Sequence, residues 1–199
     1  NIVRDVEHVA SIFPFEAEAY QEAGARVTFV GHPLADTVKA SMSYEEAMIF
    51  FGGDRVKKRI LLMPGSRKNE VEKLLPAMLK TADILTEKCE CQFFLPRAGT
   101  ISSEFIQGFL KNASPRLDII VTAGRIYDLM QICTACIASS GTATLETALM
   151  GLPTVLVYRL SAITWFLAKH LVRVEYAGLP NILHFGGSIV FIIVSNMHL

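Results

Sequence analysis

Apolar and polar residues alternate along the chain as short strand-like runs separated by longer helix-like runs. Continuous apolar runs predict strands at residues 60–63, 92–95, 117–121, 135–138 and 153–158. Helical spacing is clearest over residues 70–87 and also predicts helices at 103–112, 126–133 and 141–150. Strands that are apolar on both faces indicate a parallel sheet covered by helices. The sequence therefore predicts an α/β fold with a Rossmann-like, doubly wound parallel sheet.

The first part of the chain has a less regular pattern. Residues 1–30 predict the end of a strand, a helix at 15–23 and a strand at 27–30. Residues 34–57 predict a helical connector that ends at the turn signal Gly52-Gly53-Asp54. The regular α/β pattern is thus expected to begin after this connector.

Composition and charge narrow the class of protein. Hydrophobic residues make up 51% of the chain and charged residues 19%, which favours a large core over disorder. The 19 basic and 19 acidic residues cancel, so no net field attracts nucleic acid, and phosphate recognition must be local. No apolar run approaches the roughly 18 residues of a membrane span. Segment 163–172 is apolar around much of its circumference and fits either a membrane-interface helix or a core helix.

Four cysteines, Cys89, Cys91, Cys133 and Cys136, raise the question of a metal or redox site. No histidine or further cysteine lies at ligand spacing near Cys133 and Cys136, and these two occupy an apolar run. We therefore expect buried thiols and no metal, since free cysteine packs as a small hydrophobic residue. Cysteine usage gives no sign of an oxidising compartment, so the cytoplasm is expected.

Two junctions between a strand and a helix contain candidate phosphate-binding residues. In the first, Gly65 and Ser66 permit close approach of a ligand to the backbone, and Arg67 adds a forked cation. An ordinary tight turn with a solvated arginine explains the same residues. In the second, Ser140, Gly141 and Thr142 open a helix. Four residues after Thr142, Glu146 can accept hydrogen bonds from ribose hydroxyls or can be a surface residue.

The two junctions together restrict the ligand class. The chain has no Gly-x-Gly-x-x-Gly after its first strand and no Walker lysine, which argues against nicotinamide enzymes and ATPases. The pair suits a nucleotide diphosphate leaving group, whose charge Arg67 and helix N-termini would stabilise without a metal or cofactor.

The combined motifs resemble the lipid A disaccharide synthase family over residues 1–183. The matching stretches are Phe13-Pro-Phe-Glu16, Phe29-Val-Gly-His-Pro-Leu-Ala-Asp36, Leu62-Met-Pro-Gly-Ser-Arg67 with Glu70-Val71-Glu72, Ser139-Ser-Gly-Thr-Ala-Thr-Leu-Glu146, Val157-Tyr-Arg159 and Leu179-Pro-Asn-Ile182. The resemblance implies the C-terminal, donor-binding half of a two-domain (GT-B type) glycosyltransferase. Its members join 2,3-diacylglucosamine, carried on UDP, to 2,3-diacylglucosamine 1-phosphate by inversion.

The resemblance also implies roles for particular residues. Arg67 should contact the donor diphosphate or the acceptor phosphate, and Gly65 and Ser66 belong to its loop. Ser140, Gly141 and Thr142 should surround the diphosphate, and Glu146 should hold the ribose. Loop 122–127 is where related folds bind uracil. His32 and Asn181 should face the cleft between domains, with His32 either a base or a structural residue of the linker.

The resemblance implies a domain layout and a setting. Residues 1–56 would be the end of the N-terminal acceptor domain and a linker, and 57–183 the UDP-sugar-binding domain. Residues 184–199 depart from the family and are expected to be an apolar tail produced by truncation or a frameshift. The general base is expected in the preceding domain, so this chain alone should be inactive. The substrates place the enzyme at the cytoplasmic face of a Gram-negative inner membrane, as a peripheral protein.

Other readings remain open on these residues. UDP-sugar epimerases and the peptidoglycan glucosaminyltransferase use the same fold, so fold does not choose among them. A non-catalytic UDP-binding remnant fits the absent first domain. A metal or redox module on the cysteines is the remaining alternative.

Overall fold

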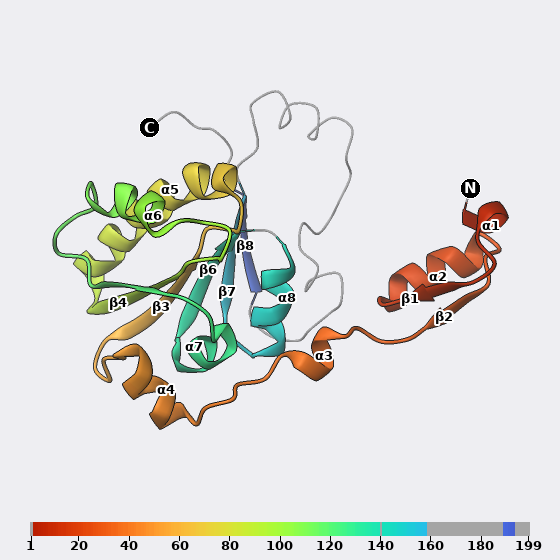
Figure 1. The fold of residues 1–199 in the computed structure, drawn as a ribbon, viewed down its shortest axis with the longest axis horizontal. Helices are drawn as coiled ribbons and strands as arrows, with labels where there is room; N and C mark the ends of the chain where they lie inside the picture. The colour runs from red at the N-terminus through yellow and green to blue at the C-terminus, as the bar shows by residue number, and fades with distance from the viewer. Residues whose placement is uncertain (1, 140, 159–188, 194–199) are drawn as a thin grey trace. The chain divides into compact units, whose positions relative to one another are not determined.

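A computed structural model of the chain describes residues 2–139, 141–158 and 189–193. The elements in chain order are α1 (Ile2–Asp5), β1 (Val9–Ser11), α2 (Pro14–Glu22), β2 (Val27–Phe29), α3 (Leu34–Thr37), α4 (Tyr44–Phe51), β3 (Lys58–Met63), α5 (Lys68–Lys88), β4 (Cys91–Pro96), α6 (Ser103–Leu110), β5 (Ile119–Thr122), α7 (Ile126–Ile132), β6 (Ala135–Ser139), α8 (Thr142–Leu149), β7 (Thr154–Tyr158) and β8 (Ile189–Ile193). The chain divides into two compact units, 1–39 and 40–199 (Figure 1).

The first unit is small. Strands β1 and β2 pair in parallel, with Val9 opposite Val27, and α2 packs on both of them. Pro14 is the first residue of α2, where a missing backbone N–H costs nothing because that group has no helical partner. Phe13, just before α2, and Ala17 within it are buried.

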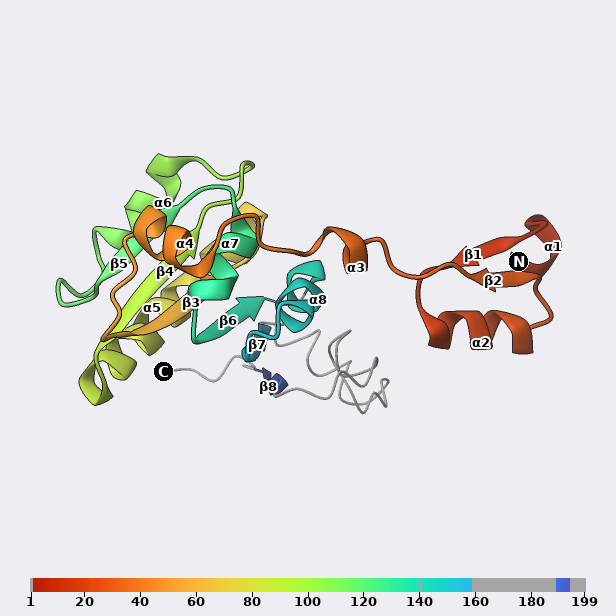
Figure 2. The same cartoon turned by 90° about the horizontal axis from the view of Figure 1, so that it is seen from below.

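The second unit contains a six-stranded sheet in the order β5-β4-β3-β6-β7-β8, and every pair in it is parallel. Ile60 of β3 lies opposite Phe93 on one side and Ala135 on the other, so β3 is a central strand. Figures 1 and 2 show helices on both faces of this sheet. The Rossmann-like, doubly wound α/β fold predicted from the sequence is confirmed.

Neighbouring residues of the central strands belong to two separate cores, one on each face of the sheet. Leu62 and Phe93 join the core beneath α5 and α6, whereas Leu61 and Phe94 join the core beneath α4 and α7. Successive side chains of a strand point to opposite faces, so continuous apolar strands supply both cores at once. This is the physical reason for the unbroken apolar runs in the sequence.

Capping residues fix the ends of α4, and helical spacing of apolar residues fixes the buried face of α5. Ser43 caps α4 and exchanges hydrogen bonds with Glu46 three residues later, which satisfies amides that have no helical partner. Gly52 then ends α4 at φ +67°, a conformation that favours glycine. In α5 the apolar residues at helical spacing are buried, namely Val71, Leu74, Leu75, Met78, Leu79 and Ala82.

One sequence-based expectation, that the thiols are buried, is corrected at Cys89. Cys89 is exposed at the end of α5, whereas Cys91 and Cys136 are buried and Cys133 is half-buried. Burial raises the pKa of Cys91 to about 11, so this thiol stays protonated. The apolar segment Ile189–Ile193 is strand β8, paired in parallel with β7, and is therefore part of the sheet. Its apolar sequence is typical of a strand in a covered parallel sheet.

Other expectations concern parts of the chain outside this description. Segment 163–172 lies outside the described residues, so the choice between a core helix and a membrane-interface helix stays open. Among the described residues, no helix is long and apolar enough to cross a membrane.

Candidate functional site

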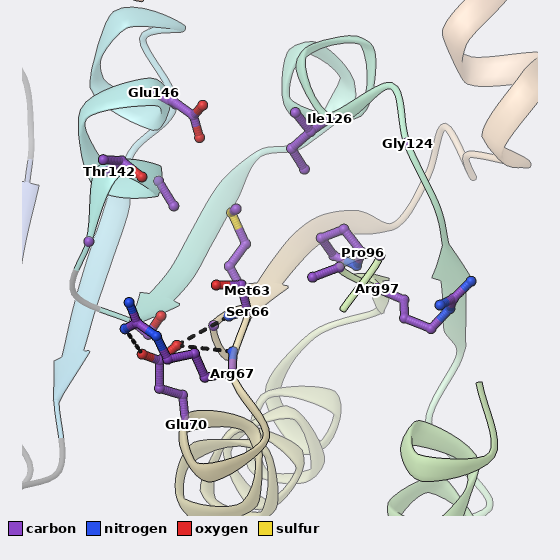
Figure 3. A pocket seen from close by; sticks show the side chains of 16 residues that line it. Met63, Ser66, Arg67, Glu70, Pro96, Arg97, Gly124, Ile126, Thr142 and Glu146 are labelled. Atoms are coloured by element: carbon purple, nitrogen blue, oxygen red, sulfur yellow. Dashed lines mark hydrogen bonds and ion pairs between the residues drawn. The ribbon is translucent and has the colours of Figure 1, made fainter. Parts of the chain in front are cut away.

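A cavity of about 660 Å³ lies at the carboxyl ends of β3, β4, β5 and β6 (Figure 3). Its walls come from the loops that follow these strands, and its size is in the range of small-molecule sites. Ligands of open parallel sheets bind at this edge, because the loops and helix N-termini converge there. Six of the seven predicted donor-binding residues line this single cavity: Gly65, Ser66, Arg67, Gly141, Thr142 and Glu146.

The loop between β3 and α5 presents amides and one cation to the cavity. Gly65 has φ +112°, and a Cβ atom here would collide with the Glu70 carboxylate, so the turn requires glycine. The Arg67 side chain is 81% exposed, and its Nη1 donates to Glu70 Oε1 at 2.8 Å. Glu70 Oε2 accepts from the backbone N–H groups of Ser66 and Arg67 at 3.2 and 3.4 Å.

Glu70 thus occupies the donors that the sequence assigned to a phosphate. A carboxylate in the first turn of α5 is stabilised by the free amides and the positive end of the helix dipole. The two amide contacts are long for hydrogen bonds, so each is weak. An anion with more charge can replace such contacts, and the same donors would then serve the ligand.

The loop between β6 and α8 forms the facing wall. The Thr144 hydroxyl and backbone N–H donate to the Gly141 carbonyl at 2.7 and 3.1 Å, which fixes the first turn of α8. Gly141 offers no side-chain cap to the first N–H groups of α8, and Gly141, Thr142 and Ala143 line the cavity. Helix N-termini of this kind attract anions.

Glu146 lies one turn further along α8 and is half-buried. Its Oε1 accepts a hydrogen bond from the Tyr127 hydroxyl at 2.9 Å. Burial, followed by the nearby Glu146 carboxylate, raises the pKa of Tyr127, so the hydroxyl remains a donor at neutral pH. Within the described part of the chain, this is the one hydrogen bond to the Glu146 side chain.

The loop between β5 and α7 closes a third side. Gly124 and Ile126 line the cavity, and Arg125 between them adopts the left-handed conformation at φ 49°. This conformation is uncommon for a residue with a side chain. The Arg125 guanidinium lies over the ring of Phe50 of α4, 5.6 Å from its centroid.

Three residues of the site were not singled out as ligands or partners from the sequence: Glu70 and Arg97, which line the cavity, and Tyr127, which contacts Glu146. Glu70 had a detectable signal, because an acidic residue three positions after the last loop residue is typical of helix capping. Arg97 lines the cavity, but its Nη1 donates to the Ile101 carbonyl at 2.5 Å and so holds its own loop. Tyr127 of α7 donates to Glu146 of α8, 19 residues further along the chain, and no local sequence pattern reveals such a contact.

The remaining predicted residues lie elsewhere. Ser140 and Asn181 are outside the described residues. His32 belongs to the first unit, where its Nδ1 accepts from the backbone N–H of Leu34 at 3.1 Å and its ring lies 5.0 Å from that of Phe13. These contacts agree with a structural histidine of the loop, and its position in a cleft stays a prediction. Among the described residues, no three His, Cys, Asp or Glu side chains are grouped to hold a metal.

Solved structures with this fold are glycosyltransferases. The ADP-heptose lipopolysaccharide heptosyltransferase II of E. coli matches with a TM-score of 0.53 and 13% identity, over 78% of this chain and 44% of that chain. WaaG, a glycosyltransferase involved in lipopolysaccharide biosynthesis, matches with a TM-score of 0.51 and 14% identity, over 94% and 48%. At such identities the likeness concerns the fold alone, and that fold is the GT-B type of glycosyltransferase.

Sequence comparison identifies the family. The family model described as Lipid-A-disaccharide synthetase matches residues 1–193, and the chain belongs to this family. Proteins named lipid-A-disaccharide synthase are 45% identical over 182 residues in Geobacter sulfurreducens and 47% identical over 183 residues in Trichlorobacter lovleyi. Each alignment covers 91% of this chain and 47% of the relative, so the chain spans about half the length of these relatives.

The extent of the match corrects one expectation. The family model continues beyond Leu183, where the resemblance was expected to stop. Strand β8 lies within this continuation, so the segment that pairs with β7 is also matched by the family. Residues 184–193 are thus part of the family match.

Proposed function

We propose that the cavity binds the UDP part of UDP-2,3-diacylglucosamine. The complete protein would transfer the sugar to 2,3-diacylglucosamine 1-phosphate, giving the lipid A disaccharide and UDP. The observation that carries the proposal is the convergence of two helix N-termini, those of α5 and α8, on one cavity. Family membership supplies the substrates, because the matched relatives are named lipid-A-disaccharide synthase.

The diphosphate is assigned to the two loops that begin these helices. Gly65, Ser66 and Arg67 approach it from one side, and Gly141 and Thr142 from the other. When the bond to the sugar breaks, negative charge develops on the departing diphosphate. Preorganised amides and a guanidinium stabilise that charge without reorganisation, which lowers the barrier to transfer.

The nucleoside is assigned to the other side of the cavity. Glu146 accepts hydrogen bonds from ribose hydroxyls through the oxygen that Tyr127 leaves free. Uracil lies against the loop that contains Gly124 and Ile126, where backbone groups are available to its polar edge. This assignment follows the loop prediction made from the sequence.

Transfer by this chain alone is not expected. Inversion needs a general base positioned at the acceptor hydroxyl. The cavity carboxylates are both engaged, Glu70 with Arg67 and Glu146 with Tyr127. The base is therefore assigned to a part of the complete enzyme outside this chain, and the 199-residue chain is proposed to bind UDP without transferring sugar.

The reaction is proposed to occur at the surface of the bacterial inner membrane, on its cytoplasmic side. Both substrates carry acyl chains, which hold them in a bilayer, so the enzyme must reach their headgroups from the aqueous phase. Co-sedimentation of the complete protein with vesicles that contain the acceptor lipid tests this part. Equal recovery in the supernatant with and without vesicles would count against it.

UDP titration of the chain by isothermal calorimetry tests the donor site. We expect saturable binding of UDP, weaker binding of ADP and a rise in melting temperature with UDP. Absence of UDP binding would refute the site assignment. For the complete protein, turnover of UDP-2,3-diacylglucosamine but not of UDP-N-acetylglucosamine separates the proposal from the epimerase and peptidoglycan alternatives.

A further inference from the structure

The first turn of α7 connects the cavity wall to the segment at the boundary between the two units. This turn carries Ile126, which lines the cavity, and Tyr127, which donates to Glu146 at 2.9 Å. The next residue, Asp128, binds Ser41 and Met42 at the start of the second unit. One helical turn therefore contacts both the cavity and residues 41–42.

Asp128 is a buried carboxylate with a full set of partners. Its side chain is 4% exposed. Oδ1 accepts from the backbone N–H groups of Ser41 and Met42 at 2.6 and 2.8 Å, and Oδ2 accepts from the Ser41 hydroxyl at 2.9 Å. Gln131 of the same helix donates to the Met42 carbonyl at 3.0 Å. These bonds fix α7 against the segment.

With α7 fixed, the Tyr127 hydroxyl has a defined place from which to hold Glu146. A glutamate side chain has three rotatable bonds, and ordering it costs free energy when it binds a ligand. A hydrogen bond to one carboxylate oxygen removes much of that freedom in advance. The second oxygen is then available to a ligand, because Glu146 lines the cavity and its carboxylate points into it (Figure 3).

We infer that Tyr127 is a positioning residue, which holds Glu146 so that its free oxygen meets the ribose hydroxyls of the nucleotide. The inference rests on the proposed function, because it needs a nucleoside in the cavity. Asp128 supports the arrangement by anchoring the same turn to Ser41 and Met42. Tyr127 itself makes no contact with the ligand in this arrangement.

The test is the preference of the chain for UDP over 2′-deoxy-UDP and 3′-deoxy-UDP, measured by calorimetry. In the unchanged chain we expect about a tenfold preference for UDP over at least one deoxy analogue, as for a hydrogen bond to a charged group. Tyr127→Phe should lower that preference to about threefold. Inorganic diphosphate, which lacks a ribose, should bind both chains equally.

Two further variants make the result specific. Tyr44→Phe removes the same hydroxyl from α4, where it accepts from Arg59 away from the cavity, and should leave the preference unchanged. Glu146→Ala should abolish the preference altogether. Equal melting temperatures of the Tyr127→Phe and Tyr44→Phe chains would exclude misfolding as the cause.

The outcomes separate the inference from the proposed function. Full ribose preference in Tyr127→Phe would refute the role of Tyr127 while leaving UDP binding intact. An equal loss of affinity for UDP and diphosphate would also refute it, because that pattern indicates general loosening of the site. Failure of the unchanged chain to bind UDP would refute the proposed function and the inference with it.

Discussion

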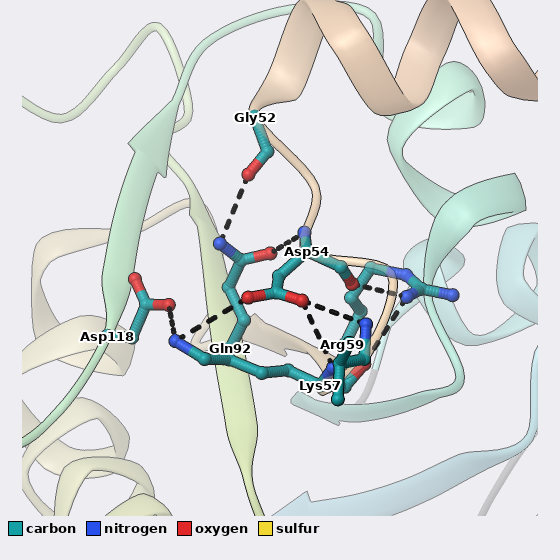
Figure 4. A network of polar contacts seen from close by, with 7 residues as sticks. Gly52, Asp54, Lys57, Arg59, Gln92 and Asp118 are labelled. Carbon is teal, nitrogen blue, oxygen red and sulfur yellow. Dashed lines mark hydrogen bonds and ion pairs between the residues drawn. The ribbon is translucent and has the colours of Figure 1, made fainter.

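The two ends of the six-stranded sheet use polar groups in opposite ways. At the amino end, the side chain of Gln92 is buried, donates to the Gly52 carbonyl at 3.1 Å and accepts from the Asp54 N–H at 2.8 Å (Figure 4). Lys57 Nζ lies 2.8 Å from Asp118 Oδ2. At the carboxyl end, the loops are glycine-rich and their amides and Arg67 face a cavity.

The polar groups at the two ends differ in their partners: those at the amino end are paired within the protein, and those at the carboxyl end are open to a ligand. At the amino end the protein satisfies its own groups, and Arg59 illustrates this by donating to the carbonyls of Ile132 and Asp54, both at 2.6 Å. Buried polar groups that are paired in this way stabilise one arrangement of the chain. At the carboxyl end, donors are held at the surface by weak or exposed partners, and a ligand can engage them.

The largest loss of stability is expected from substitution of Asp128. This carboxylate lies near the carboxyl end of the sheet but is fully hydrogen-bonded, unlike the cavity donors there. Asp128→Ala leaves the amides of Ser41 and Met42 without their acceptor, and should lower the free energy of unfolding by about 3 kcal/mol. Urea unfolding of the chain measures this. A loss under about 1 kcal/mol would show that the site behaves like an exposed one.

The pH dependence gives a control for the same variant. Burial raises the pKa of Asp128, but hydrogen bonds from Met42 and Ser41 lower it more, so the net pKa lies below its usual value. A carboxyl with a lowered folded-state pKa stabilises the protein above its unfolded pKa, about 3.9. The difference between the two chains should be constant above this pH and shrink as the pH falls further.

The next largest effect is expected at the amino end. Gln92→Leu removes the partners of the Gly52 carbonyl and the Asp54 N–H, and should cost about 2 kcal/mol of unfolding free energy. UDP affinity should not change, because the cavity lies at the opposite end. Gln107→Leu, on the exposed face of α6, is the matched control and should be near neutral. A change in UDP affinity would break the separation of the two ends.

At the carboxyl end, Arg67→Ala should reverse this pattern. The loss of a charged donor to the diphosphate should weaken UDP binding about tenfold, or about 1.4 kcal/mol. Stability should change by less than about 0.5 kcal/mol, because the Arg67–Glu70 pair is largely exposed. Arg55→Ala, which removes an exposed pair with Glu45, serves as the control and should leave UDP affinity unchanged.

The smallest expected effect is a gain. Glu70→Gln removes the negative charge that occupies the Ser66 and Arg67 donors, and should strengthen UDP binding about threefold, by about 0.7 kcal/mol. Glu72→Gln, exposed on the same helix, should have no such effect. Weaker UDP binding in Glu70→Gln would mean that the carboxylate organises the loop for the ligand.

The local pattern of apolar and polar residues was sufficient to predict most of the fold. Strands β3 to β7 and the helices between them were predicted, because buried parallel strands must be apolar on both faces. The sequence also singled out the two loops that follow β3 and β6, and both line the cavity, while their phosphate-binding role stays a prediction. All of these signals lie within a few residues along the chain.

Contacts between distant segments were not predictable in this way. Tyr127 and Glu146 belong to different helices, and only their packing brings the hydroxyl to the carboxylate. Asp128 binds Met42 and Ser41, which lie 86 and 87 positions earlier in the chain. No periodic sequence pattern connects residues so far apart. Residues 184–199 were expected to be a tail because the motif resemblance stopped at Leu183, and no local pattern revealed that Ile189–Ile193 pairs with β7.

The carboxylate of Glu70 has a consequence for which anions reach the site. An intramolecular carboxylate is always present at high effective concentration, so a singly charged anion such as chloride or acetate gains little by displacing it. A diphosphate brings more charge and more acceptor atoms than the group it replaces. If the loop binds the donor diphosphate as proposed, the Glu70 carboxylate should therefore make it select multivalent over singly charged anions.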